Sequence, residues 1–236
     1  IKPSNEFSLT NSGIQISANH KDNLISKTWE QLLSCYSNIN PVDVYLYKNI
    51  PIGSGLGGGS SNAAFFLKAV NKLNNLGLSL DEMELIIRKV GADCPFFIQN
   101  KSVVATGIGN VFCPITNPIH NMYITLIFPQ INMSTKEAYG NINLIRDKVI
   151  YYSNNHINNI LISDITKWKN ELKNDFEDLV AVDFPEIFEI KYTLYDKGAF
   201  YASLTGSGSS IYAVSHKPLN IDELKNKYLT WSVFID

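Results

Sequence analysis

Gly-Ser-Gly-Leu-Gly-Gly-Gly-Ser-Ser-Asn-Ala-Ala, at residues 53–64, is the stretch that decides the fold of this chain. Five of the seven residues from 53 to 59 are glycine. Glycine lets the backbone adopt positive φ angles and lets peptide N–H groups approach a bulky anion without a Cβ in the way. A helix that begins directly after such a loop adds unpaired N–H donors and a partial positive charge of about +0.5 e at its N-terminus. The stretch therefore predicts a phosphate-binding loop.

The residues on either side of the loop predict a strand before it and a helix after it. Residues 42–48 alternate apolar and polar side chains and are rich in β-formers, which predicts a strand. Pro51 ends it, because proline cannot donate to a β-ladder. Apolar residues recur at helical spacing over 63–73, and the Ser-Ser-Asn at 60–62 favours an N-cap. Strand, glycine loop and helix in this order favour a nucleotide site over a flexible Gly/Ser linker.

Neither of the two commonest nucleotide fingerprints fits the loop. A P-loop needs Gly-Lys-Ser/Thr after its spacer, and no lysine lies between Lys48 and Lys68. A dinucleotide fingerprint needs an acidic residue about 20 positions further on, at the end of a second parallel strand. Asp81 lies near that distance, but it opens a predicted helix over 81–90. The loop therefore belongs to another class.

The loop resembles the second motif of the superfamily of galactokinases, homoserine kinases, mevalonate kinases and phosphomevalonate kinases, which reads Pro-x-x-x-Gly-Leu-Gly-Ser-Ser-Ala. Residues 51–64 match it well. The longer form with Gly-Gly-Gly-Ser-Ser-Asn-Ala-Ala is similar to one branch, the 4-diphosphocytidyl-2-C-methyl-D-erythritol kinases. Four further segments are similar to that branch, and the resemblance covers nearly the whole chain: Gly91–Phe97, Ser134–Tyr139, Asn174–Glu177 and Ser203–Ser210.

Asp93 is the candidate catalytic residue. Gly91 follows the predicted helix 81–90 and favours its end, and Pro95 keeps Cys94 out of the α region. Asp93 is therefore predicted to lie in a short ordered turn, where an aspartate can simply be a turn-former. A phosphate loop elsewhere in the chain favours a carboxylate that accepts the proton of a substrate hydroxyl. In the superfamily the matching aspartate is the proposed catalytic base, and it also contacts the substrate.

The resemblance implies which residues bind ATP. In and before the loop they are Pro51, Gly53, Gly55, Leu56, Gly57, Gly58, Gly59, Ser60, Ser61 and Asn62. Ser60 is also the candidate for contacting Mg²⁺, with a purely structural N-cap as the alternative. Asn23, Leu24 and Lys48 lie where relatives contact adenine or line its pocket, although Lys48 also suits a solvated strand end.

The candidate substrate site lies in the second half of the chain. Residues 205–209, Thr-Gly-Ser-Gly-Ser, separate two apolar runs and predict strand, turn and strand, which also suits a plain hairpin. In the superfamily this turn faces the phosphate loop and borders both substrates, which implies Gly206, Ser207 and Gly208. The resemblance also implies that Tyr139 stacks on a base and that Thr135 contacts the substrate. An aromatic residue on a helix is otherwise commonly part of the core.

One departure from the branch is plain. Its members begin with a strand that carries Ala-Lys-x-Asn-Leu, followed by a Gly-Tyr-His turn, and neither motif occurs here. In the family the lysine works with the aspartate and the Tyr-His pair grips the cytosine. We therefore expect a chain shortened at its N-terminus. The missing motif favours, as an alternative function, a non-catalytic nucleotide-binding paralogue.

Composition limits the class of protein. The 236 residues carry a net charge of −2, with 45% hydrophobic residues, so we expect a packed core and no basic surface for nucleic acid or anionic membranes. Three widely spaced cysteines predict reduced thiols and a cytoplasmic protein, and the four histidines lack metal-ligand spacing. The most apolar stretch, 122–128, is far shorter than a membrane span.

We expect an α+β fold of two domains, an N-terminal ATP-binding domain over 1–130 and a C-terminal α+β domain over 131–236. Strands are predicted at 102–106, 123–128, 199–214 (a pair) and 231–235, and helical stretches at 135–141, 158–172, 184–194 and 221–228. The family's architecture implies ATP and acceptor in a cleft between the domains. We expect a monomer or weak dimer.

The resemblance implies a reaction as well as a fold. ATP, with Mg²⁺, would phosphorylate 4-diphosphocytidyl-2-C-methyl-D-erythritol at its 2-hydroxyl in the non-mevalonate isoprenoid pathway. Another kinase of the superfamily, of the homoserine or mevalonate type, is a second alternative. The Gly-Ala-Asp-Cys-Pro segment and Asn62 argue against it.

Overall fold

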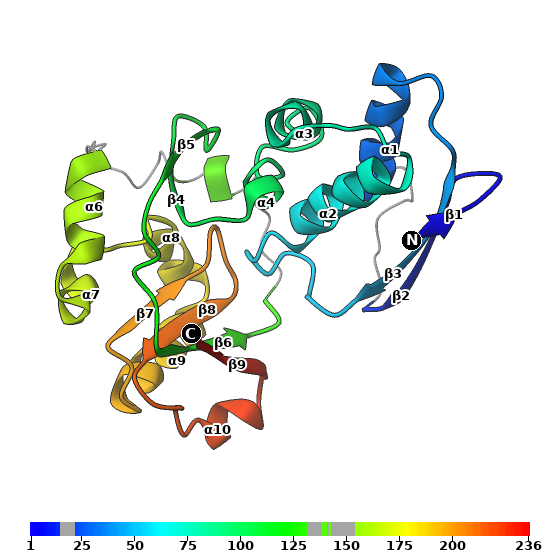
Figure 1. Ribbon diagram of the computed structural model, residues 1–236. Helices are drawn as coiled ribbons and strands as arrows, with labels where there is room; N and C mark the ends of the chain where they lie inside the picture. The colour runs from blue at the N-terminus through cyan, green and yellow to red at the C-terminus, as the bar shows by residue number, and fades with distance from the viewer. Residues whose placement is uncertain (15–21, 132–137, 141, 143–153) are drawn as a thin grey trace. The chain divides into compact units, whose positions relative to one another are not determined.

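The computed structural model describes residues 1–14, 22–131, 138–140, 142 and 154–236 (Figure 1). It divides into two compact units: residues 1–52 with 57–114, and residues 53–56 with 115–236. The predicted boundary at 130 therefore differs from the one that the contacts define. Strand β6 (Met122–Phe128) joins the second unit because it pairs with strands from the end of the chain.

The first unit is built on a three-stranded sheet in the order β1-β3-β2. β1 (Lys2–Pro3) pairs antiparallel with β3 (Val42–Lys48), and β2 (Ser8–Gly13) pairs with β3 in parallel. The predicted strand 42–48 is confirmed residue for residue. Its alternation also holds, because Val42 and Val44 are buried while Tyr45 and Tyr47 are exposed on the other face.

Helices cover the buried face of this sheet. The crossover from β2 to β3 carries α1 (Leu24–Cys35), which packs against α2 (Gly58–Leu73). α3 (Leu80–Ile87) follows, with a capping box formed by Ser79 and Glu82. Apolar residues of α1, α2, α3 and β3 form one core, and the short helix α4 (Phe96–Gln99) adds Ile98 to it. The hairpin of β4 (Val103–Thr106) and β5 (Val111–Pro114) completes the unit.

The second unit is built on an antiparallel sheet in the order β7-β8-β6-β9. β7 (Tyr201–Leu204) lies at one edge beside β8 (Ile211–Ser215), and β9 (Leu229–Ile235) lies at the other edge. One core cluster contains residues of α8 (Phe176–Asp183), α9 (Pro185–Asp196) and α10 (Asp222–Lys225) with sheet residues such as Ile127 and Ile211. A second cluster gathers Trp168 with Tyr201 and Val214.

Several predicted boundaries differ from the structure. The predicted helix 158–172 is split into α6 (Asn154–Ile162), the 3₁₀ helix η2 (Ile165–Lys167) and α7 (Trp168–Glu171). The split occurs where the Asp164 side chain accepts a hydrogen bond from the Thr166 N–H and begins a new turn. α3 ends at Ile87, before the predicted Val90. β2, β5 and α8 were not predicted, and most of the predicted helix 135–141 lies outside the described residues.

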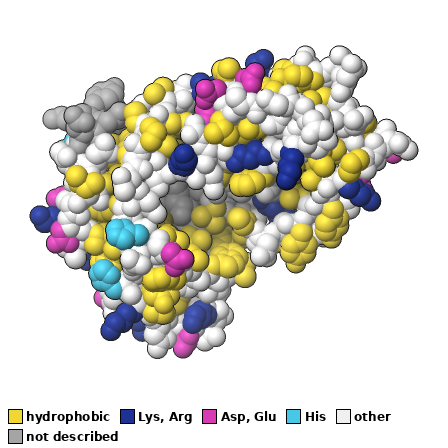
Figure 2. Space-filling view, in the orientation of Figure 1, with side chains coloured by type: hydrophobic (Ala, Val, Ile, Leu, Met, Phe, Trp, Pro, Cys, Tyr) yellow, Lys and Arg dark blue, Asp and Glu magenta, His cyan; other side chains and the backbone are white. Residues whose placement is uncertain are grey.

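No disulfide joins the three cysteines, all of which lie in the described part of the chain. On the face in Figure 2, basic (dark blue) and acidic (magenta) side chains are interspersed, and neither kind covers it. Within the described part of the chain, no helix has both the length and the apolar character needed to cross a membrane.

Candidate active site

The start of α2 is the centre of the candidate phosphate site. The helix begins at Gly58, not at the predicted Ala63, and Gly57 is its N-cap in the left-handed conformation, with φ 63° and ψ 20°. No side chain caps it, so the predicted N-cap at residues 60–62 is wrong: these residues lie inside the helix. The first intrahelical bond runs from the Ser61 N–H to the Gly57 carbonyl, at 2.9 Å. The N–H groups of residues 58–60 precede that bond and suit an anion.

Glycine is required at Gly57 by a neighbouring ring as well as by its φ angle. A Cβ there would lie 2.9 Å from Cζ of Phe97, which comes from α4. The left-handed turn brings the chain directly into the helix. The absence of a side chain lets α4 lie against that turn.

Lys48 places a positive charge beside this helix start. It is the last residue of β3, and it is only 7% exposed. A Cβ added to Gly58 would lie 3.0 Å from the Lys48 Nζ. No carboxylate of the described residues forms an ion pair with it, and burial lowers the pKa of the ammonium group. The charged form of a buried lysine is strongly stabilised when an anion binds next to it.

The Asp93 turn adjoins the same helix start. Asp93 is exposed, and the following residue, Cys94, is fully buried. The Ser60 side chain hydrogen-bonds to the Cys94 thiol. Burial raises the pKa of that thiol. The Cys94 N–H donates to the Gly91 carbonyl at 3.2 Å, which closes the turn. The predicted short turn is confirmed, and within the first unit it lies beside the first turn of α2.

The candidate adenine contacts lie at the start of α1. The Asn23 side chain caps α1 by accepting a hydrogen bond from the Ile25 N–H at 2.9 Å. Leu24 follows it and approaches α2, because a Cβ on Gly59 would lie 3.6 Å from a Leu24 methyl carbon. The structure thus brings Leu24, Lys48 and the helix start together and gives Asn23 a capping role.

The second glycine motif forms the turn between β7 and β8, as predicted. The Thr205 N–H donates to the Ser210 carbonyl, and the Gly208 N–H donates to the Thr205 carbonyl, both at 2.8 Å. Gly206 and Gly208 have positive φ angles of 51° and 100°. The Ser209 hydroxyl donates to the Ile131 carbonyl at 2.6 Å. Ser207 is buried in the same turn.

Residues 53–56, the first part of the glycine loop, are tied to this turn. The Ser54 carbonyl accepts hydrogen bonds from the Ser210 N–H at 3.1 Å and from the Thr205 hydroxyl at 3.2 Å. Gly55 has a φ of 75°, and a Cβ there would lie 2.2 Å from the Thr205 carbonyl oxygen. Only glycine fits this approach. The two glycine motifs therefore meet inside the second unit.

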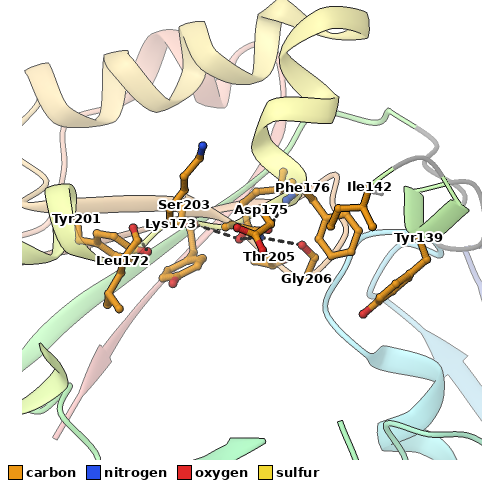
Figure 3. Close-up of a pocket in the computed structure, with 13 residues that line it drawn as sticks. Tyr139, Ile142, Leu172, Lys173, Asp175, Phe176, Tyr201, Ser203, Thr205 and Gly206 are labelled. Carbon is orange, nitrogen blue, oxygen red and sulfur yellow. Dashed lines mark hydrogen bonds between the residues drawn. The ribbon is translucent and has the colours of Figure 1, made fainter. Parts of the chain in front are cut away.

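A cavity of about 820 Å³ opens beside the second motif (Figure 3). Two of the predicted substrate residues, Tyr139 and Gly206, line it, and Thr135 lies outside the described residues. Tyr139 is 61% exposed, and its ring meets that of Phe176 edge to face at 5.0 Å. The remaining walls are Ile142, Leu172, Lys173, Asn174, Asp175, Tyr201, Ser203, Leu204, Thr205 and Tyr212.

Most of the residues that line the cavity were not predicted from the sequence. Tyr201 and Tyr212 both line the cavity, and burial raises the pKa of each phenol. The segment 174–177 drew attention only through its resemblance to the kinase branch. The one available signal for it was Asn174 followed by Asp175, two residue types common at helix starts, directly before a helix that begins with Phe and Glu.

Comparison with known proteins agrees with this arrangement. The model of the GHMP kinases N terminal domain matches residues 23–101, and that of the GHMP kinases C terminal domain matches residues 157–230. A protein of Azobacteroides pseudotrichonymphae named 4-diphosphocytidyl-2-C-methyl-D-erythritol kinase is 45% identical over 88% of this chain and 75% of its own length. The protein of that name from Bacteroides thetaiotaomicron is 43% identical over 89% and 74%.

Solved structures show the same fold. A crystal structure of 4-(cytidine 5'-diphospho)-2C-methyl-D-erythritol kinase covers 98% of this chain and 82% of its own, with a TM-score of 0.78 and 24% identity. A homoserine kinase from Cytophaga hutchinsonii has a TM-score of 0.69 at 17% identity, covering 99% of this chain and 83% of its own.

The fold and the two glycine motifs define an ATP-dependent small-molecule kinase, and the chain belongs to the GHMP kinases. Within that family it belongs to the group of the 4-diphosphocytidyl-2-C-methyl-D-erythritol kinases. The predicted α+β fold with N- and C-terminal kinase domains is confirmed.

Proposed function

We propose that this protein transfers the γ-phosphoryl group of ATP to the 2-hydroxyl of 4-diphosphocytidyl-2-C-methyl-D-erythritol, a step of the non-mevalonate isoprenoid pathway. The names of its relatives, at 43–45% identity, support the choice of acceptor. The observation that carries the chemistry is local to the first unit: the Asp93 turn adjoins a helix start with free N–H donors, next to the buried Lys48.

ATP is held by its phosphates in this proposal. The N–H groups of Gly58, Gly59 and Ser60 point out of the start of α2, and Lys48 adds a charge next to them. An ammonium group whose pKa is lowered by burial is stabilised by the incoming phosphate. Leu24 offers an apolar contact beside the same helix for the adenine ring. The remaining loop residues stay candidates for contacts with ATP: Pro51, Gly53, Gly55, Leu56, Gly57, Ser61 and Asn62.

Asp93 accepts the proton of the acceptor hydroxyl. The hydroxyl oxygen forms a bond to the γ-phosphorus, the bond from that phosphorus to the β,γ-bridging oxygen breaks, and ADP leaves with the electron pair. Catalysis of this transfer rests mainly on positioning and charge stabilisation. The exposed carboxylate of Asp93 is open to an incoming hydroxyl.

The cavity of the second unit suits the cytidine part of the acceptor. Tyr139 presents an exposed ring for stacking, Gly206 and Thr205 border the cavity through the second motif, and Ser207 and Gly208 continue that motif. Its polar walls, including Tyr201 and Tyr212, offer hydrogen-bonding groups to the sugar or pyrophosphate.

Ser60 is the residue that would hold Mg²⁺ when MgATP is bound. Among the described residues there is no cluster of three or more His, Cys, Asp or Glu side chains that could hold a metal ion. In this proposal the Ser60 hydroxyl would be the protein's contact to the ion. Mg²⁺ would supply charge neutralisation on the phosphates. We further place the protein in the cytoplasm as a monomer or weak dimer.

A coupled assay of ADP release tests the proposal. The full-length protein is offered 4-diphosphocytidyl-2-C-methyl-D-erythritol, homoserine, mevalonate and galactose, each with MgATP, and ³¹P NMR locates the new phosphate. Turnover of the first acceptor alone, with a phosphomonoester on its 2-hydroxyl, is expected. Turnover of another acceptor would replace the substrate assignment. ATP binding without any turnover would indicate a non-catalytic paralogue.

A further inference from the structure

Strand β7 is an edge strand whose last residue is held from outside the sheet. β7 pairs only with β8 in the sheet order, and Leu204 is its final residue. Both backbone groups of Leu204 bond to side chains of one distant segment: its N–H donates to Glu177 at 3.0 Å, and its carbonyl accepts from Asn174 at 2.9 Å. The two side chains pair the backbone N–H and carbonyl of Leu204, as a neighbouring strand would, directly before the Thr205–Ser210 turn begins.

Asn174 uses its whole amide group in this way. Its Nδ2 donates to the Leu204 carbonyl at 2.9 Å and to the Gly206 carbonyl at 2.8 Å (Figure 3). Its Oδ1 accepts from the Phe176 N–H at 3.0 Å, at the start of α8. The amide therefore spans Thr205 and fixes the peptides on both sides of it. No smaller or singly functional side chain can make all three bonds.

Glu177 anchors the same strand end with a buried charge. One carboxylate oxygen accepts from the Leu204 N–H and, at 3.2 Å, from the Ser203 hydroxyl. The other accepts from the Lys191 ammonium group at 2.7 Å, and the Glu177 side chain is only 7% exposed. A buried carboxylate with three donors is a rigid anchor, because losing any donor leaves charge unsatisfied.

The contacts continue from this anchor into the candidate site. Thr205, held between the two bonds of Asn174, donates to the Ser54 carbonyl and lies against Gly55. Phe176, whose N–H is fixed by Asn174, contacts the ring of Tyr139. One short segment thus supports the glycine loop, the second glycine motif and the candidate stacking ring.

We propose that Asn174 and Glu177 are positioning residues, which hold the Thr205–Gly208 turn in the geometry that phosphoryl transfer requires. This inference rests on the proposed function for its catalytic consequence, but its structural part stands apart from any substrate. Neither side chain touches the reacting atoms; both act through the backbone of Leu204 and Gly206.

Asn174→Asp is the sharpest test. The carboxylate keeps the acceptor for the Phe176 N–H but replaces the donor with an oxygen that repels both carbonyls. Amide hydrogen exchange at residues 205–210 should become at least about tenfold faster, while α9 is unchanged. Because displacements of about 1 Å can cost about 100-fold in rate, kcat should fall about 10- to 100-fold, with a smaller change in KM. Asp183→Asn makes the reverse exchange at the exposed C-terminal end of α8. It should change neither the amide exchange at 205–210 nor kcat.

A second variant guards against a folding defect in the first. Glu177→Gln keeps an acceptor for the Leu204 N–H and loses the charge that faces Lys191, so the same exchange effect should appear at smaller size. Unchanged exchange at 205–210 in both variants overturns the proposal, whatever the activity. Faster exchange with wild-type kcat also overturns it, because the turn would then not need fixing. If the wild-type protein itself lacks turnover, the proposed function fails while the exchange data still decide the structural part.

Discussion

The two glycine motifs of this chain look alike in sequence and differ in how their polar groups are used. At the start of α2 the backbone N–H groups of Gly58, Gly59 and Ser60 precede the first intrahelical bond, and no side chain caps them. At Thr205–Ser210 the main chain is tied by Asn174, by Ser54 and by its own cross-turn bonds, and the Ser209 hydroxyl is tied to Ile131.

The difference separates binding from shaping. A loop with unused donors can give them to a ligand, whereas a loop whose groups are already bonded presents a fixed contour. We therefore expect changes at the first motif to affect ATP or the chemical step directly. Changes at the second motif should affect activity indirectly, by shifting the backbone of the Thr205–Ser210 turn.

Asp93→Asn should have the largest effect and would place the chemistry next to the first motif. The amide cannot accept the proton, so kcat should fall by about 100- to 10,000-fold, the usual contribution of a general base. The ATP Kd, measured by calorimetry, should stay within about threefold, because Asp93 is exposed and makes no bond to the start of α2. Near-normal turnover would show that Asp93 only forms the turn.

Gly55→Ala should come next, because Gly55 lies where the two motifs are tied together. The left-handed conformation costs about 1–2 kcal/mol for a residue with a Cβ, and contact with the Thr205 carbonyl adds overpacking of about 1–3 kcal/mol. The free energy of unfolding, from urea denaturation, should fall by about 3 kcal/mol, and turnover should fall sharply with it.

Gly109→Ala is the matched control for that change. Gly109 has a similar φ of 82°, and nothing lies within 4 Å of the Cβ it would gain. The free energy of unfolding should fall only by the cost of the left-handed conformation, about 1–2 kcal/mol. Equal losses at Gly55 and Gly109 would show that the close approach between the motifs carries no energy.

Much of this comparison was visible in the sequence because it depends on local pattern. The strand Val42–Lys48 was predicted exactly, since its alternation matches one buried and one exposed face. The turn between β7 and β8 was predicted from small residues between two apolar runs. The start of α2 was misplaced because side-chain preference pointed to residues 60–62, whereas a left-handed Gly57 begins the helix with backbone alone.

The parts that were missed depend on contacts distant in sequence. Asn174 bonds to Leu204, which lies 30 residues away in sequence, and Glu177 bonds to it across 27 residues. Neither bond can therefore be predicted from the local sequence. The division into two units also depends on distant pairing, because Tyr123 in β6 pairs with Ser215 and Phe234 far along the chain. Such pairings follow from the assembled sheet and leave no trace in local periodicity.

Lys48→Met tests whether the first motif binds through charge. A charge-assisted bond to phosphate is worth about 1.5–3 kcal/mol, so the ATP Kd should rise about 10- to 100-fold. In the native protein burial lowers the pKa of Lys48 below its ordinary 10.5. ATP affinity should therefore be greatest where Lys48 is protonated and should decline as pH rises through that lowered pKa, and the variant should lack this decline.

Protein stability should change in the opposite direction. A lysine pKa below the unfolded value means that the protonated group disfavours the folded state, fully so at pH below the folded pKa. Lys48→Met should therefore raise the melting temperature at pH 7 while it weakens ATP binding. A variant that binds ATP normally and melts earlier would assign Lys48 to the core alone.

Ser60→Ala should have the smallest effect and decides how the first motif contributes to the metal. The Ser60 hydroxyl does not cap α2, so a change in helix stability is not expected, and the melting temperature should stay within about 2 °C. If the hydroxyl is a Mg²⁺ ligand, the Mg²⁺ concentration for half-maximal rate should rise about 3- to 10-fold. Cys94→Ala is the control, because it removes the hydrogen-bond partner of Ser60 and leaves the hydroxyl in place. A matching rise in both variants would mean that Ser60 acts by holding the Asp93 turn, and the first motif would then share the shaping role of the second.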